Sequence, residues 1–103
     1  MNVEFRRGVL VLAILRLLDK EQYGYSLREI LNRYGLEINE GTLYPLLRRL
    51  ESQKLLKSDW RIGDGRPRKY YRISGKGKTS LEKMSKEWTE LVGAMNNILG
   101  MKS

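Results

Sequence analysis

The segment from residue 39 to residue 56 carries leucines at the spacing of an amphipathic helix. Leu43, Leu46, Leu47 and Leu50 fall on one side of a helix with about 3.6 residues per turn, so we expect this stripe to face a core. The other sides are polar, aromatic and basic. They carry Gly41, Tyr44, Pro45, Arg48, Arg49 and Ser52. Taken alone, such an outer side is typical of a solvated helix, and the rest of the chain decides whether it does more.

An earlier apolar run, residues 9–18, predicts a first core helix. Leu10, Ile14, Leu17 and Leu18 repeat the spacing of a buried stripe. The run follows two arginines, as in a secretory signal, but Arg16 interrupts it. It is also far shorter than the ~18 residues that a membrane span needs. We therefore expect no membrane segment and a cytoplasmic protein.

A second helical pattern lies between these two segments. Leu27, Ile30, Leu31 and Tyr34 supply its inner face, and Gly35 is expected to end it in a left-handed conformation. The preceding Tyr-Gly-Tyr, residues 23–25, is expected to form a turn. Its tyrosines either pack there or place a hydroxyl near a phosphate at the positive end of the helix.

Capping residues set the expected starts of these helices. Ser26 is expected to cap the second helix by accepting the backbone N–H of Glu29. Asn39 is a natural cap for the third helix, but Pro45 lies six residues further on and lacks the N–H that a helix interior uses. Either the helix is kinked near its start, or Thr42 caps its regular part and Pro45 lies within the first turn. Both solutions crowd these residues at the N-terminal tip.

Alternating patterns predict two strands, at residues 57–62 and 69–74. One face of the first strand carries Ser58, Trp60 and Ile62. Opposite-facing positions are occupied by Arg61 in the first strand and by Tyr70 and Arg72 in the second. Tyr71 and Ile73 share a face of the second strand. The segment between them, residues 63–68, is glycine-rich and carries two arginines. The pattern therefore predicts a β-hairpin with a basic tip.

The last segment has the pattern of a long helix with an apolar seam. Apolar residues recur at alternating spacings of three and four from residue 81 to residue 98, as in a coiled coil. The seam consists of Leu81, Met84, Trp88, Leu91, Val92, Met95 and Ile98. The first helix can cover one or two of these residues, but a domain this small cannot cover the whole seam. We therefore expect a homodimer, with Trp88 either packing in its centre or flanking a flat aromatic ligand.

Composition narrows the chemistry that this chain can carry out. The chain of 103 residues has no cysteine and no histidine, which removes thiolate or histidine metal sites and nucleophilic triads. We expect no enzyme, no metal and no cofactor. The formal net charge is +8, and residues 57–72 contain six basic and two acidic side chains. A concentrated basic stretch suits a polyanion such as double-stranded DNA.

Three helices followed by a hairpin with a basic tip predict a winged helix-turn-helix. The expected fold is mainly α with a small β-hairpin, divided into a DNA-binding domain at residues 1–75 and a dimerisation helix at residues 76–103. In this architecture the third helix enters a DNA major groove and the hairpin contacts the backbone or the minor groove. The predicted DNA contacts are Tyr25, Asn39, Thr42, Tyr44, Pro45, Arg48, Arg49, Arg66, Arg68 and Lys69.

Three motifs, in the same order along the chain, resemble those of the PadR-type transcriptional regulators. They are Tyr23-Gly24-Tyr25, then Thr42-Leu43-Tyr44-Pro45 followed by Arg49-Leu50-Glu51, then Gly65-Arg66-Pro67-Arg68-Lys69-Tyr70-Tyr71. The resemblance implies a homodimeric repressor that releases its operator on an inducing signal. The single terminal helix is similar to the short subgroup that includes multidrug-responsive repressors. There a tryptophan, matched by Trp88, stacks on planar cationic drugs at the dimer centre.

The chain departs from this family pattern at two places. The family usually has a glycine after the Arg-Leu-Glu segment, where this chain has Gln53-Lys54-Leu55, so the turn into the first strand is expected to differ. It also has Ile73-Ser74 where Leu-Thr commonly precedes the last helix. The alternative function is a winged-helix protein-interaction module without specific DNA binding, and the steep salt dependence of DNA binding would separate the two.

Overall fold

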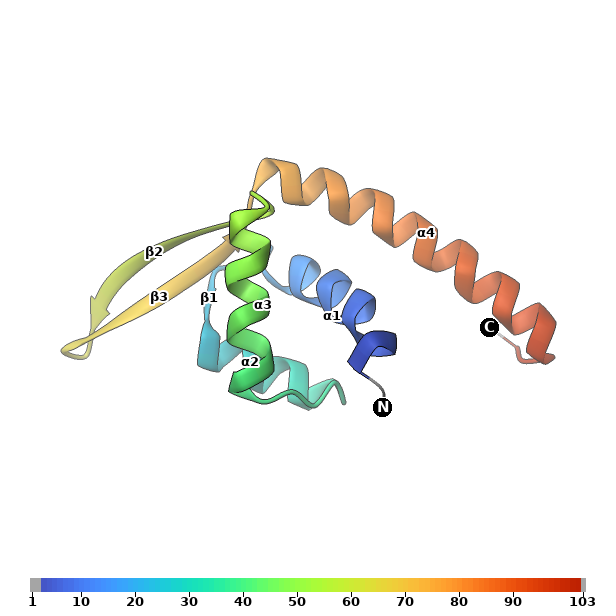
Figure 1. Cartoon of the computed structure of the whole chain (residues 1–103), viewed down its shortest axis with the longest axis horizontal. Coiled ribbons are helices and arrows are strands. Elements are labelled where there is room, and N and C mark those ends of the chain that lie inside the picture. Colours follow the sequence, from blue (N-terminus) through green and yellow to red (C-terminus); the bar gives the residue numbers. More distant parts are fainter. Residues whose placement is uncertain (1–2, 103) are drawn as a thin grey trace.

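The computed structural model describes the backbone of residues 3–102 and the side chains of residues 6–102. Three helices form a body from which a hairpin and a long helix extend in opposite directions (Figure 1). The elements are α1 (Val3–Leu17), β1 (Gln22–Tyr23), α2 (Gly24–Arg33), α3 (Glu40–Ser52), β2 (Leu56–Gly63), β3 (Arg66–Ile73) and α4 (Gly75–Leu99). The molecule measures 54 × 27 × 20 Å. This arrangement confirms the mainly α winged-helix fold with a long C-terminal helix.

The core is built from the leucine stripes that the helical spacing predicts. The buried side chains include Leu10, Ile14, Leu18, Leu27, Leu31, Leu43, Leu47 and Leu50. Leu17 and Leu46 pack against this core while partly exposed. Tyr34, in contrast, is 75% exposed, so its predicted place on the inner face of α2 is wrong. It lies just beyond the last helical residue, where Gly35 (φ +88°) turns the chain away as predicted.

The start of α2 differs from the predicted cap at Ser26. Its cap position is Tyr23, three residues before Ser26, so the helix begins at Gly24, directly after the short strand β1. The Ser26 hydroxyl does not accept a helix N–H, and its one proton is shared between the Tyr23 carbonyl oxygen at 2.9 Å and Gln22 Oε1 at 2.8 Å. Because Gln22 and Tyr23 pair with β3, they form an edge strand of a three-stranded sheet and not a free turn.

The N-terminus of α3 has the cap that the sequence predicts. Asn39 Oδ1 accepts the Thr42 backbone N–H at 3.0 Å, so the alternative in which Thr42 is the cap is wrong. Pro45 therefore lies inside the helix. Its missing N–H leaves the Gly41 carbonyl without the usual helical partner, and the exposed position of Gly41 lets water serve instead.

The hairpin is longer and tighter than the predicted one. β2 and β3 pair continuously from Leu56 opposite Ile73 to Gly63 opposite Arg66. Only two residues connect them, Asp64 (φ +54°) and Gly65 (φ +77°), as in a type I′ turn. The predicted six-residue tip is therefore wrong, since residues 66–68 belong to β3. A tight turn of this kind matches the twist of the flanking strands and fixes their register.

A close backbone contact joins α4 to the base of this hairpin. Ser74 caps the helix by accepting the Gly77 N–H at 2.9 Å, and its hydroxyl donates to the Lys54 carbonyl at 2.6 Å. Leu81 and Met84 pack against the core, as expected for the part of the seam that α1 can cover. The distal seam is exposed, with exposed fractions of 44% for Trp88 and 75% for Ile98. Within the described residues, no helix is long and apolar enough to cross a membrane.

Candidate nucleic-acid interface

A hollow of about 680 Å³ lies between the hairpin, hereafter the wing, and the N-terminal parts of α2 and α3. Six of the ten predicted DNA contacts line it. They are Tyr25, Tyr44, Arg48, Arg66, Arg68 and Lys69. The lining therefore combines aromatic hydroxyls from two helices with basic side chains from α3 and β3. Apart from Glu40, the residues that line it are neutral or basic, which favours an anionic occupant.

Tyr44 is held in this hollow by its contact with the start of α2. A Cβ atom at Gly24 would lie 2.6 Å from Tyr44 Cε1, so only glycine lets the tyrosine ring approach so closely. Partial burial, together with the nearby Glu40 carboxylate, raises the pKa of Tyr44. The Glu29 carboxylate likewise raises the pKa of the exposed Tyr25. Both hydroxyls thus remain protonated at neutral pH, and that of Tyr25 is directed to Glu29.

The basic residues of β3 differ in how much of their charge is balanced by the protein. Lys69 Nζ lies 3.0 Å from Glu51 Oε1, and this pairing raises the pKa of Lys69. Arg68 lies over the Tyr23 ring, 4.7 Å from its centroid. Among the side chains that the structure describes, no carboxylate lies within ion-pair distance of Arg66 or Arg68. The unpaired positive charge that the wing contributes to the hollow therefore comes from these two arginines.

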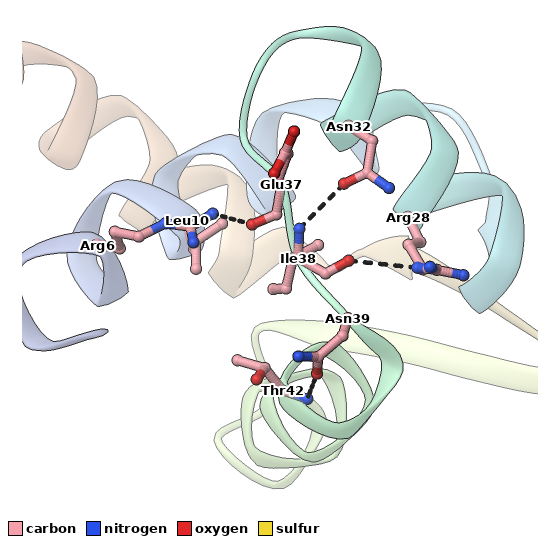
Figure 2. Close-up of a pocket in the computed structure, with 8 residues that line it drawn as sticks. All are labelled: Arg6, Leu10, Arg28, Asn32, Glu37, Ile38, Asn39 and Thr42. Carbon is pink, nitrogen blue, oxygen red and sulfur yellow. Dashed lines mark hydrogen bonds between the residues drawn. The ribbon is translucent and has the colours of Figure 1, made fainter. Parts of the chain in front are cut away.

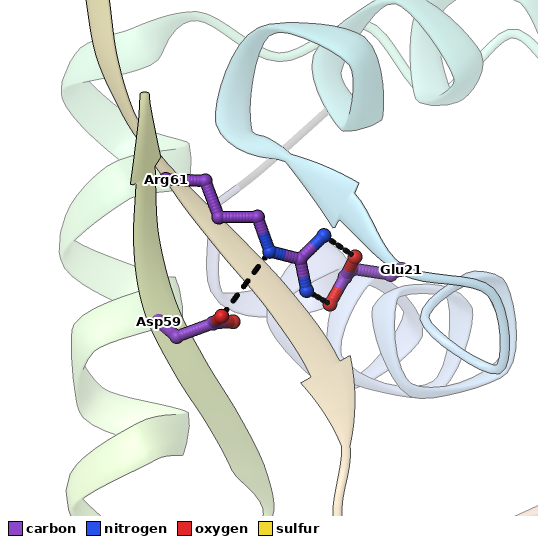
Figure 3. Close-up of polar contacts among 3 residues, drawn as sticks. All are labelled: Glu21, Asp59 and Arg61. Atoms are coloured by element: carbon purple, nitrogen blue, oxygen red, sulfur yellow. Dashed lines mark hydrogen bonds and ion pairs between the residues drawn. The ribbon is translucent and has the colours of Figure 1, made fainter. Parts of the chain in front are cut away.

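Arg61 fastens the wing to the body (Figure 3). Its guanidinium forms a bidentate ion pair with Glu21, with 2.5 Å between Nη2 and Oε2, and its Nε lies 3.2 Å from Asp59 Oδ2. The ion pair with Glu21 raises the pKa of Arg61. The guanidinium also lies over the Tyr70 ring. This contact spans the sheet from β2 to the segment before β1, and a separation of forty residues hides it from the sequence pattern.

The remaining predicted contacts lie on other parts of α3. Asn39 and Thr42 border a second hollow of about 550 Å³, where side chains hold the segment between α2 and α3 (Figure 2). Asn32 Oδ1 accepts the Ile38 N–H at 3.0 Å, and Arg28 Nε donates to the Ile38 carbonyl at 3.3 Å. These bonds fix where α3 begins, a role of Asn32 and Arg28 that no local sequence pattern indicates.

Pro45 and Arg49 lie on a third side of α3, away from the wing. Together with Thr42 they border a small hollow beside Arg7 of α1. The predicted contacts thus surround the exposed sides of α3 and do not form one cluster. Within the described residues, no group of three or more acidic, histidine or cysteine side chains could hold a metal ion.

Comparison with known proteins agrees with this geometry. The model of the transcriptional regulator PadR-like family matches residues 11–83. Transcriptional regulator Rv3488 from Mycobacterium tuberculosis is 39% identical over 101 residues, which cover 97% of this chain and 92% of that protein.

Solved structures of similar proteins share the whole fold. A PadR family transcriptional regulator from Eggerthella lenta is 42% identical with a TM-score of 0.87, and the match covers 97% of this chain and 89% of that chain. A PadR-like transcriptional regulator from Bacillus cereus is 35% identical with a TM-score of 0.86, and the match covers 96% and 99% of the two chains. The likeness therefore extends through the wing and α4.

Proposed function

Because the chain belongs to the PadR-like family of transcriptional regulators and is not an enzyme, we propose that it is a homodimeric repressor that reads an operator with α3 and the wing. The observation that carries this proposal is the basic, aromatic hollow shared by α3 and β3. In a winged helix, this side of the third helix faces the major groove. The proposed contacts are Tyr25, Asn39, Thr42, Tyr44, Pro45, Arg48, Arg49, Arg66, Arg68 and Lys69.

The salt dependence of DNA affinity tests this proposal. Binding that neutralises phosphates weakens linearly with the logarithm of salt concentration, with a slope of about −0.9 per phosphate contacted. Replacing Arg66 and Arg68 with alanine should therefore reduce the magnitude of the slope by about two for each protomer, or about four for the homodimer, because neither arginine is paired with a carboxylate among the described side chains. The matched control replaces Arg16 and Arg33, two exposed arginines that do not line the hollow. Equal slopes for the two double variants would reject the proposed role of the wing.

The proposed homodimer is supported by the uncovered seam of α4. Trp88, Leu91 and Ile98 are 44–75% exposed, and apolar positions at heptad spacing continue to the helix end. Pairing two such helices would bury them. Sedimentation should show a dimer at micromolar concentration for the natural chain and a monomer for Leu91→Glu. A natural chain that sediments as a monomer would exclude this mechanism.

We further propose that a planar aromatic compound acts as the inducer by stacking on Trp88 at the dimer centre. A ligand can release the operator only if it binds one arrangement of the two DNA-reading heads better than the other. The chain has two tryptophans, so Trp60→Phe leaves Trp88 as the only indole for the fluorescence titration, while operator binding is measured on the natural chain because Trp60 lines the hollow. Quenching of Trp88 that parallels loss of operator binding would support a compound as inducer. Quenching without loss of operator binding would reject it.

A winged-helix interaction module without DNA binding is the second candidate. The exposed apolar side chains of Trp60 and Ile62 on the wing favour this candidate, because exposed apolar side chains also mark protein interfaces. It predicts DNA affinity that is weak and the same for all duplexes. Selection of duplexes from a random pool distinguishes the two candidates, because only a sequence-specific regulator enriches a consensus.

A further inference from the structure

The far half of the wing carries apolar side chains that remain mostly exposed among the described residues. Trp60 is 67% exposed and Ile62 is 80% exposed, and both lie on the same face of β2. Ile62 is directly opposite Pro67 on β3, which is also exposed. These three residues, the wing strip, are held in register by eight consecutive strand pairs and a two-residue turn. A rigid apolar edge therefore projects from a basic protein.

The surroundings of the wing strip are those of a surface that meets a polyanion. Arg66 and Arg68 flank Pro67 along β3, and neither is paired with a carboxylate among the described side chains. Asp64 in the turn is the acidic residue of the tip. An apolar protein partner would have to leave both guanidinium groups exposed at its edge or supply acids for them. A nucleic acid supplies phosphates on both sides of each groove.

We propose that the wing strip lies in the minor groove of the operator, with Ile62 and Pro67 against the sugars and base edges and Arg66 beside them. This inference rests on the proposed function and assigns a reading role to the wing. The minor groove presents only acceptors at A·T pairs, whereas a G·C pair adds the guanine 2-amino donor. Apolar side chains at the floor leave that donor without a partner, which is unfavourable. The wing therefore selects against G·C pairs beneath it.

Apolar side chains are an established means of contacting the minor groove. Proteins that bind there commonly place isoleucine, leucine or proline against the base steps, with basic residues beside them. The wing strip has this composition, and its arginines repel a second copy of the same edge. Charge complementarity therefore favours a DNA duplex over another wing as the occupant.

Inosine substitution tests the proposal directly. A duplex selected by the natural protein is altered at the pairs beneath the wing, from A·T to G·C and from A·T to inosine·cytosine. Inosine lacks the 2-amino group, so its minor groove matches A·T while its major groove matches G·C. We expect G·C to weaken binding about tenfold, a typical cost of one mismatched pair, and inosine·cytosine to change it by less than about twofold. Equal losses for the two substitutions would overturn the proposal.

Variants of the wing strip assign the effect to its side chains. Ile62→Ser should remove most of the discrimination between G·C and inosine·cytosine, while the slope of affinity against salt stays unchanged because no charge is lost. Ile62→Val, which keeps an apolar surface, should retain it. Discrimination that persists in Ile62→Ser overturns the inference. A changed oligomeric state in that variant also overturns it, because the strip would then be an interface between copies.

These outcomes are separate from those of the proposed function. If the natural protein enriches a consensus duplex and the salt dependence of its DNA affinity depends on Arg66 and Arg68, the proposed function is supported whatever the result for the Ile62 variants. If no duplex is enriched, the proposed function fails, and the inference fails with it. A protein that binds an operator but does not distinguish pairs by the 2-amino group rejects the role of the wing strip and leaves the proposed function standing.

Discussion

Gly77 lies where α4 leaves the wing, and the space around it admits no larger residue. It is buried, and a Cβ atom there would lie 2.2 Å from the Leu55 carbonyl oxygen and 2.7 Å from Ile73 Cγ1. Because the first of these is a backbone atom, the helix or the strand must move to accept a methyl group. Gly75, in the same helical turn, has nothing within 4 Å of its corresponding position. The two glycines therefore form a matched pair for the same substitution.

The two substitutions should change stability in opposite directions. Gly75→Ala should stabilise the protein by about 0.4–1 kcal/mol, because alanine restricts the unfolded chain and fits the helix. Gly77→Ala has the same benefit but must displace the Leu55 carbonyl, which also accepts the Ser74 N–H at 3.0 Å. Overpacking costs about 1–3 kcal/mol and a weakened hydrogen bond about 0.5–1.5 kcal/mol. We therefore expect a net loss of about 2 kcal/mol for Gly77→Ala.

Urea unfolding followed by circular dichroism measures this difference. Protein concentration is held fixed, because the stability of a dimer depends on it. In thermal unfolding, each kcal/mol corresponds to a shift of about 4 °C for a chain of about 100 residues. Gly77→Ala should therefore melt well below the natural chain and Gly75→Ala slightly above it. If Gly77→Ala is as stable as Gly75→Ala, the proposed docking of α4 on Leu55 is wrong.

Two further predictions concern the end of α3. Lys54 has a left-handed backbone (φ +68°), so Lys54→Gly should raise the free energy of unfolding by about 0.5–1 kcal/mol. The control Gln53→Gly changes a residue with a negative φ of −81° and should lower it. Thermal unfolding that ranks the two variants in the opposite order would refute this prediction. Glu51 accepts hydrogen bonds from the Ser58 hydroxyl and from Lys69, which lower its pKa below the usual 4.5. The contribution of the Glu51 carboxylate to the free energy of unfolding is therefore present above about pH 4.5 and is lost as the pH falls through the folded-state pKa. Glu51→Gln should cost less than about 1 kcal/mol at pH 7, because the pair is partly exposed, and should flatten the acid dependence of unfolding; an unchanged acid dependence would contradict it.

The helices could be predicted because their signals are local. The stripe of Leu43, Leu47 and Leu50 depends only on spacing within one segment, and it is buried as predicted. The cap at Asn39 is equally local and is confirmed. Strand β1 could not be predicted, since its two residues are defined by pairing with residues 70–71 far along the chain. The wrong cap at Ser26 follows from the same omission, because α2 begins where β1 ends.

The candidate site shows the same division between local and distant signals. The density of positive charge in the sequence predicts that basic residues gather on the wing, but it does not show which of them form ion pairs within the protein. Lys69 is paired with Glu51 and Arg61 with Glu21, and neither partner is near in sequence. The exposure of Ile62 is also invisible in an alternating pattern, because the same pattern describes a strand that packs against the core. Whether Ile62 is exposed or buried depends on how far the wing projects beyond α3.

The turn after α3 connects these observations to the proposed regulation. Lys54, in the turn after α3, adopts a left-handed backbone conformation (φ +68°) that usually favours glycine. Its carbonyl accepts the Ser74 hydroxyl, and the adjacent Leu55 carbonyl packs on Gly77, so the end of α3, the base of the wing and the start of α4 form one rigid joint. In the proposed dimer, a ligand can change the angle between the paired α4 helices. A flexible hinge at this joint would absorb that change, but the joint has none. The change would move α3 and the wing together, altering the spacing of the two DNA-reading heads and not the shape of either head.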